Sequence, residues 1–117
     1  MSETPNALKI DYVEFSTPDL PASKDFFARA FGWGFVDYGP SYAAFEGAGL
    51  DGGLDGGAQT PGGTSLVILK ADDLEAAQAR IEAAGGIVTV PIFDFPGGRR
   101  FHFREPGGAE LAVWAEV

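Results

Sequence analysis

The chain has 117 residues, 45% of them hydrophobic, which is enough for one compact domain with a sizeable core. Seventeen acidic residues against eight basic ones give a net charge of −9. This charge argues against nucleic acid and anionic membranes as partners. It would attract a cationic small ligand, or it keeps the protein dissolved. The absence of cysteine excludes disulfides and thiolate metal sites and favours the cytoplasm.

The first half of the chain begins with a predicted strand at residues 8–16, which is rich in β-branched and aromatic residues. Its alternation places Ile10, Tyr12 and Glu14 on one face and Asp11, Val13 and Phe15 on the other. A helix is expected within residues 17–32, with Asp19 as N-cap and Gly32 ending it. Its buried stripe would hold Leu20, Phe27, Ala30 and Phe31. Short strands are then expected at 33–38, 41–47 and 50–56.

The second half repeats this plan. A strand is predicted at 64–71, followed by a helix at 72–86 that is capped by Asp72 or Asp73. The buried stripe of this helix would hold Leu74, Ala77, Ile81 and Ala84. Three further strands are expected at 87–93, 99–105 and 109–116. The order β-α-β-β-β thus occurs twice, about 55 residues apart, so neither half is expected to form a good core alone.

The repeat predicts a single α+β domain of two modules. Module one covers about residues 8–55 and module two about 64–116, and the Gly- and Pro-rich segment 56–63 joins them. The stretch GLDGGLDGG, residues 49–57, has too few units to stack as a calcium-binding array. We interpret it as a glycine-loosened edge strand or a close approach to another backbone.

Two segments carry a resemblance to a known family. The sequences STPDLPASKDFFARAFGW, which opens the first module, and REPGGAELAVW, which closes the second, are similar to motifs of the vicinal-oxygen-chelate superfamily. This family includes glyoxalase I, extradiol dioxygenases and bleomycin-resistance proteins. The resemblance implies two β-α-β-β-β modules in a curled mixed sheet around a cavity, helices on its outer face, and a homodimer. Members differ widely in chemistry, so the fold alone does not specify a function.

The resemblance also implies where metal ligands would lie. Aligned on the motifs, three of the four ligand positions fall on Tyr12, Leu66 and Ala112. The fourth falls in the segment LDGGL, residues 50–54, or just beyond, where Asp51, Asp55, Gly52 and Gly53 are the open choices. Leucine and alanine have no lone pair to offer, and a neutral phenol is a poor ligand. We therefore expect no family metal centre and assign no cofactor.

The single histidine of the chain, His102, lies in a predicted strand between Phe101 and Phe103. Two phenylalanines on one face favour the helix-covered core, so His102 and Arg100 should look into the cavity. The resemblance agrees, because matching positions line the ligand pocket in glyoxalase-like members. Arg99 and Arg104 are interpreted as solvated rim charges.

The same reasoning predicts the rest of the cavity. Glu14 could be a general base or the partner that orients His102, and Arg100 could hold a carboxylate or phosphate. The expected walls and floor are Tyr12, Tyr42, Trp114, Leu66 and Ile68. Each also has a structural alternative: a hydrogen-bonded core histidine, a salt bridge inside the barrel or across a dimer interface, and aromatic walls without a chemical role.

Three functions stay open. The leading hypothesis is metal-independent binding of a small organic molecule. The second is a glyoxalase-like lyase or isomerase that acts on a small carbonyl compound through His102 and Glu14. The third is a structural or regulatory dimer that fills its own cavity. The acidic charge favours a cationic ligand, whereas Arg100 favours an anionic group.

Overall fold

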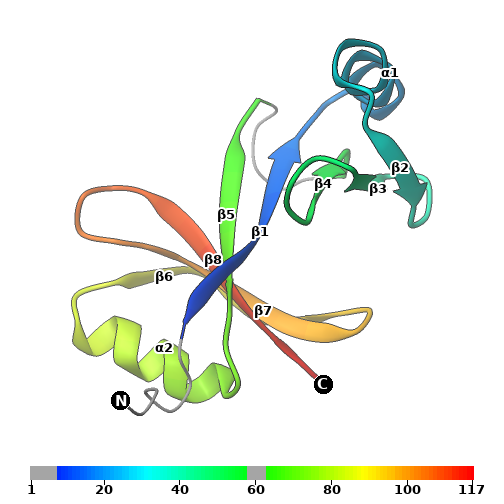
Figure 1. The fold of residues 1–117 in the computed structure, drawn as a ribbon. Helices are drawn as coiled ribbons and strands as arrows, with labels where there is room; N and C mark the ends of the chain where they lie inside the picture. Colours follow the sequence, from blue (N-terminus) through cyan, green and yellow to red (C-terminus); the bar gives the residue numbers. More distant parts are fainter. Residues whose placement is uncertain (1–7, 58–62) are drawn as a thin grey trace. The chain divides into compact units, whose positions relative to one another are not determined.

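The computed structural model describes residues 8–57 and 63–117. It divides into two compact units. The N-terminal unit is Tyr12–Leu66, and the C-terminal unit combines the start of the chain up to Asp11 with Val67–Val117. Each contains a helix and a mixed set of strands (Figure 1). The α+β class and the twofold β-α-β-β-β order are thereby confirmed. Most of the predicted joint at 56–63 lies outside the described residues.

The N-terminal unit orders its strands β2-β3-β4-β1. β1 and β4 are parallel, and the other neighbours are antiparallel. The elements are β1 (Lys9–Ser16, whose first three residues belong to the other unit), α1 (Leu20–Phe31), β2 (Gly34–Asp37), β3 (Tyr42–Glu46) and β4 (Gly52–Asp55).

Helix α1 begins and ends at the predicted residues. The Asp19 side chain accepts the amide hydrogen of Ala22, and Gly32 ends the helix with φ of 76°, a left-handed conformation that suits glycine. Leu20 is buried and Phe27 packs beside it against the sheet. The predicted stripe is wrong for its last two members, because Ala30 and Phe31 are exposed.

Aromatic stacking explains this difference. The Phe27 ring stacks on Trp33 at 4.9 Å between centroids, and Phe31 lies 5.4 Å from the same indole. The rings at the end of α1 therefore contact one another and Trp33, and Phe31 stays 58% exposed. Edge and offset contacts of this kind add to the stability gained by burying part of the rings.

The C-terminal unit orders its strands β5-β8-β7-β6, with β5 and β8 parallel (Figure 1). Its elements are β5 (Ser65–Lys70, of which the first two residues belong to the other unit), α2 (Leu74–Ala83), β6 (Ile87–Phe95), β7 (Gly98–Arg104) and β8 (Glu110–Glu116).

Helix α2 covers one face of this sheet. Of the two predicted caps, Asp73 is the one used, and its side chain accepts the amide hydrogen of Ala76. Leu74 packs with Phe101 and Phe103 in the core. Ala84, the last member of the predicted stripe, is exposed because the helix has already ended there. The prediction that both phenylalanines face the helix is confirmed.

An ion pair links α2 to the sheet. Arg99 donates two hydrogen bonds to Glu75, at 2.7 and 3.0 Å, and the guanidinium lowers the pKa of the Glu75 carboxyl to about 2. The prediction that Arg99 is a solvated rim charge is therefore wrong. Strand alternation places Arg99 on the helix side of β7, where a helix carboxylate can reach it. Arg104 is exposed, as predicted.

Of the two roles expected for the glycines of β4, the structure contradicts one and confirms the other. β4 pairs with both β3 and β1, so it is not an edge strand. The predicted close approach to a backbone is confirmed at Gly52, where a Cβ atom would lie 2.3 Å from the Val13 carbonyl oxygen. At Gly53 the close neighbour is instead a side chain, that of Tyr42. Within the two described ranges, no helix is long and apolar enough to cross a membrane.

Candidate functional site

In the C-terminal unit the sheet face opposite α2 carries four of the eight predicted site residues. His102 and Ala112 are cross-strand partners, as are Arg100 and Trp114. Ile68 pairs with Ala112 from the other side. Directly paired residues share a face, so the structure brings Arg100, His102, Trp114 and Ile68 together on one surface.

The His102 side chain is buried, with only 8% of it exposed. Its Nδ1 atom lies 3.6 Å from Glu110 Oε2, within range of an ion pair but too long for a hydrogen bond. The same Glu110 oxygen accepts a hydrogen bond from the Thr89 hydroxyl at 2.8 Å. The Phe93 ring is 6.0 Å from the imidazole, and the Arg100 guanidinium carbon lies 5.5 Å from the centre of that ring.

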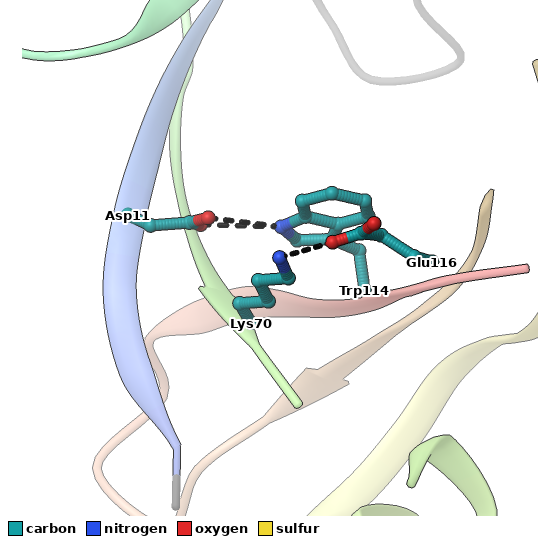
Figure 2. A network of polar contacts seen from close by, with 4 residues as sticks. All are labelled: Asp11, Lys70, Trp114 and Glu116. Atoms are coloured by element: carbon teal, nitrogen blue, oxygen red, sulfur yellow. Dashed lines mark hydrogen bonds and ion pairs between the residues drawn. The ribbon is translucent and has the colours of Figure 1, made fainter. Parts of the chain in front are cut away.

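Trp114 belongs to a polar network at the end of β8. Its indole N–H points at both carboxylate oxygens of Asp11, at 3.2 and 3.3 Å. The Lys70 ammonium lies 5.0 Å from the centre of the indole ring and pairs with Glu116. Figure 2 shows these four side chains converging. The indole is thus held in one orientation by a carboxylate at its edge and an ammonium over its face.

The N-terminal unit contains a second polar group, on its sheet face opposite α1. The Tyr42 hydroxyl donates to Glu14 Oε2 at 2.9 Å, and the Tyr12 and Tyr42 hydroxyl oxygens are 2.7 Å apart. Glu14 is buried, with 6% exposed. Burial, followed by the Glu14 charge, raises the pKa of Tyr42 far above its ordinary value. The Tyr42 hydroxyl therefore keeps its proton at neutral pH.

Pairing within the two units identifies the metal-ligand position that the sequence left open. Glu14 pairs with Gly53, and Ile68 pairs with Ala112. Tyr12 lies two residues before Glu14 on β1, and Leu66 lies two residues before Ile68 on β5. The pair Glu14–Gly53 in the first module therefore matches the pair Ile68–Ala112 in the second, so Gly53 corresponds to Ala112.

The four positions at which the resemblance implies metal ligands are therefore Tyr12, Gly53, Leu66 and Ala112. They offer one phenol, itself hydrogen-bonded to Tyr42, and no imidazole or carboxylate. A divalent metal normally needs three or four nitrogen, oxygen or sulfur ligands, so these residues do not fit one. Across residues 8–57 and 63–117, no group of three or more His, Asp or Glu side chains could hold a metal ion elsewhere.

The N-terminal unit is also hollowed in two places. One hollow, of about 430 Å³, lies between the β2–β3 hairpin and the turn before β4 and includes Val36, Tyr38 and Asp51. The other, of about 300 Å³, lies beside the start of α1 and includes Phe15 and Thr17. Among the described residues that line these two hollows, none is a predicted catalytic or ligand-binding residue.

Sequence reasoning missed several members of these groups. Glu110 shares the strand parity of Ala112, which could have placed it on the His102 face. Thr89 and Phe93 lie on β6, whose pairing with β7 shifts register twice, so parity alone could not place them.

Asp11 was expected on the same face as Val13 and Phe15. Because β1 passes from one unit to the other at this residue, Asp11 instead contacts Trp114. Leu66, predicted as cavity floor, is half-buried.

Residues 9–113 match the Glyoxalase/Bleomycin resistance protein/Dioxygenase superfamily. The chain belongs to this superfamily. The match covers both modules and agrees with the resemblance carried by the two sequence motifs.

Individual relatives extend the comparison. The anthracycline biosynthesis protein DnrV of Streptomyces peucetius is 31% identical, over 88% of this chain and 45% of its own length. A Mn(II)-bound glyoxalase from Novosphingobium aromaticivorans is 26% identical, with a TM-score of 0.69 over 97% of this chain and 40% of its own. A methylmalonyl-CoA epimerase from Mycobacterium tuberculosis shares the fold, with a TM-score of 0.72 at 14% identity over 100% and 93% of the two chains. The chain thus spans about half the length of the first two relatives.

Proposed function

We propose that this superfamily member binds a small organic molecule without a divalent metal. One observation carries the proposal: the four family ligand positions hold Tyr12, Gly53, Leu66 and Ala112, and the only polar group among them hydrogen-bonds to Tyr42. Binding must then rely on side-chain hydrogen bonds, charge and aromatic contact.

The C-terminal unit supplies the recognition of an anionic group in this proposal. Arg100 is half-buried and its guanidinium lies over the Phe93 ring. This contact pre-orders a planar fork of donors that fits a carboxylate or phosphate. Phe93 is 37% exposed and offers an aromatic surface next to that fork. Ile68 and Trp114 would form the floor and end wall of the same surface.

The relatives support an organic ligand with an aromatic part. DnrV is named as an anthracycline biosynthesis protein, and anthracyclines contain fused aromatic rings. Because the chain spans 45% of DnrV, the activity of the whole relative is not carried over. The proposal takes only the class of ligand, an aromatic molecule with an acidic group.

Metal analysis tests this function directly. Protein purified without an affinity tag or chelator should contain no stoichiometric transition metal by elemental mass spectrometry. Added Mn²⁺, Ni²⁺ or Zn²⁺ should leave Tm unchanged, whereas an aromatic carboxylate such as 1-naphthoate should raise it, because binding to the native state alone stabilises it. Arg100→Gln should remove the naphthoate effect. A bound stoichiometric metal would overturn the proposal.

A second function is favoured by the group around His102. Glu110, at 3.6 Å from Nδ1 and held by Thr89, is placed to orient the imidazole. One relative is a glyoxalase. We therefore keep a lyase or isomerase of small carbonyl compounds, with His102 as an acid–base group, as the alternative. It predicts turnover of methylglyoxal–thiol adducts that His102→Ala abolishes without loss of fold. Unchanged turnover in His102→Ala would remove the histidine from the mechanism.

The proposal includes a homodimer in the cytoplasm, as the resemblance and the absence of cysteine imply. Large apolar side chains on the surface support association: Phe26 and Phe31 on α1 are 57% and 58% exposed. Light scattering after size exclusion should give twice the chain mass of 12.3 kDa. The mass of one chain at micromolar concentration would contradict the dimer.

A further inference from the structure

The hollow at the turn between β3 and β4 contains none of the residues that the proposed function uses. Its volume of about 430 Å³ lies within the range of small-molecule sites. Its lining includes three large side chains that are apolar or aromatic and two that are acidic: Val36, Tyr38, Leu50, Glu46 and Asp51. A ligand that satisfies both kinds of side chain needs an apolar body and a positive charge.

Glycine shapes the turn that borders this hollow. Gly47 and Gly49 have φ of 81° and 98°, left-handed conformations that other residues rarely adopt. The end of the turn is anchored to β1, because the Val13 amide donates to the carbonyl oxygen of Asp51 at 3.1 Å. Glu46 before the turn and Asp51 after it therefore line the same hollow.

The apolar part of the lining is open to solvent. Tyr38 and Leu50 are 65% and 57% exposed, and Val36 is 38% exposed. Single exposed apolar side chains are common, but three around one hollow form a surface that a ligand can cover. Covering this area removes apolar surface from water, which favours binding.

The two carboxylates are open to a cation. In the described part of the chain, neither Glu46 nor Asp51 has a side-chain hydrogen bond or an ion pair. Glu46 pairs across the strands with Gly34, which has no side chain to cover the carboxylate. The net charge of −9 adds to the attraction of a cation. Two carboxylates are too few for a divalent metal ion, which needs a fuller set of oxygen ligands.

We propose that this hollow binds an organic ammonium ion with an apolar body. The ammonium group lies against Glu46 and Asp51, and the body covers Tyr38 and Leu50. The inference gives the chain a second class of ligand, opposite in charge to the one proposed for Arg100. It does not depend on that proposal, because the two sites share no residue.

Three probes with one body and different charges test the site. At neutral pH, 4-phenylbutylamine is a cation, 4-phenylbutan-1-ol is uncharged and 4-phenylbutanoate is an anion. Binding to the full chain is followed in ¹H–¹⁵N NMR titrations through the amides of residues 46–51. We expect the amine to bind about fivefold more tightly than the alcohol, the ratio that two exposed ion pairs give. The butanoate should bind most weakly here. Salt at about 1 M should bring the amine-to-alcohol ratio toward one by screening the charges.

Four variants separate charge from apolar contact. Glu46→Gln and Asp51→Asn should each lower the amine-to-alcohol ratio about twofold, and both together should bring it near one. Glu82→Gln removes the same charge from an exposed position on α2 and should leave the ratio unchanged. Leu50→Ala should weaken all three probes and keep the ratio, because it removes only apolar contact. If a variant does not fold, the salt dependence of the wild type decides.

The outcomes distinguish this inference from the proposed function. Three results would each overturn the ammonium site: equal binding of amine and alcohol, a ratio that high salt or the double variant leaves unchanged, or no shift of the amides of residues 46–51. None of them affects the binding of 1-naphthoate through Arg100. Conversely, a stoichiometric transition metal in the purified protein would overturn the proposed function and leave the ammonium site standing.

Discussion

The two units share one plan on their helix sides and differ on the opposite sheet faces. Each helix has an aspartate N-cap, Asp19 or Asp73, and packs apolar side chains against its sheet. Each is also tied to its sheet by an ion pair, Lys24–Asp37 in one unit and Arg99–Glu75 in the other. The opposite faces differ: the N-terminal unit has two tyrosines in a hydrogen-bonded group with Glu14, and the C-terminal unit has His102 and Arg100, with Glu110 beside the histidine.

This difference shows that folding constrains the helix side of each unit more strongly than the opposite sheet face. The helix side must bury apolar area in both units, because that burial provides most of the stability. The opposite face has no such requirement, so it can diverge in charge.

The largest effect is expected where the helix side is most tightly packed. Phe101 is fully buried, and Phe101→Ala should lower the free energy of unfolding by about 3–5 kcal/mol. Phe31→Ala, at a ring that is 58% exposed, should cost less than about 1 kcal/mol. Urea denaturation followed by circular dichroism measures both. Similar losses for the two variants would contradict the assignment of Phe101 to the core.

The next largest loss of stability is expected on the sheet face of the N-terminal unit opposite α1. Gly53→Ala places a Cβ atom against the Tyr42 ring and hydroxyl and should cost about 2 kcal/mol by displacing that phenol. The same change in a Tyr42→Ala background should cost much less, because the obstruction is gone. Urea denaturation of the four proteins gives the coupling energy. Additive costs would show that Gly53 is needed for some other reason.

A smaller effect is expected in the network of Figure 2. Trp114→Phe removes the hydrogen bond from the indole to Asp11 and should cost about 1 kcal/mol. In an Asp11→Ala background the additional loss should fall, because that hydrogen bond no longer exists. Trp33, in the other unit, remains as the fluorescent probe for urea denaturation. If Trp114→Phe lowers the free energy of unfolding equally in both backgrounds, the loss comes from packing of the indole ring and not from its hydrogen bond to Asp11.

The smallest effect concerns the ion pair between α2 and β7. Arg99 lowers the pKa of Glu75 from its ordinary 4.5 to about 2, so the unfolded chain binds this proton more readily. The pair therefore stabilises the fold above about pH 4.5, and this contribution is lost as pH falls toward 2. The Tm difference between wild type and Glu75→Gln should close over that range.

The matching control for Glu75 is the same substitution in an Arg99→Gln background. Without the guanidinium, the pH-dependent difference in Tm should disappear. A difference that stays constant from pH 5 to pH 2 would show that the pair does not perturb the carboxyl.

The sequence alone determined the elements, their order and which face of β7 meets the helix. These features depend on local rules: an aspartate that caps a helix, a glycine that ends it, and side chains that alternate along a strand. Phe101 and Phe103 could be assigned to the core because side chains two residues apart on a strand share a face. Two large apolar side chains on one face favour the side of the sheet that the helix covers. The family resemblance likewise rests on short contiguous motifs.

Only the tertiary structure decided the polar groups. Tyr42 reaches Glu14 from 28 positions away, and Trp114 reaches Asp11 from 103. Such contacts depend on strand register and on space left by a residue in between, as at Gly53. No local pattern encodes either, because a hydrogen bond between distant strands exists only after the strands have paired.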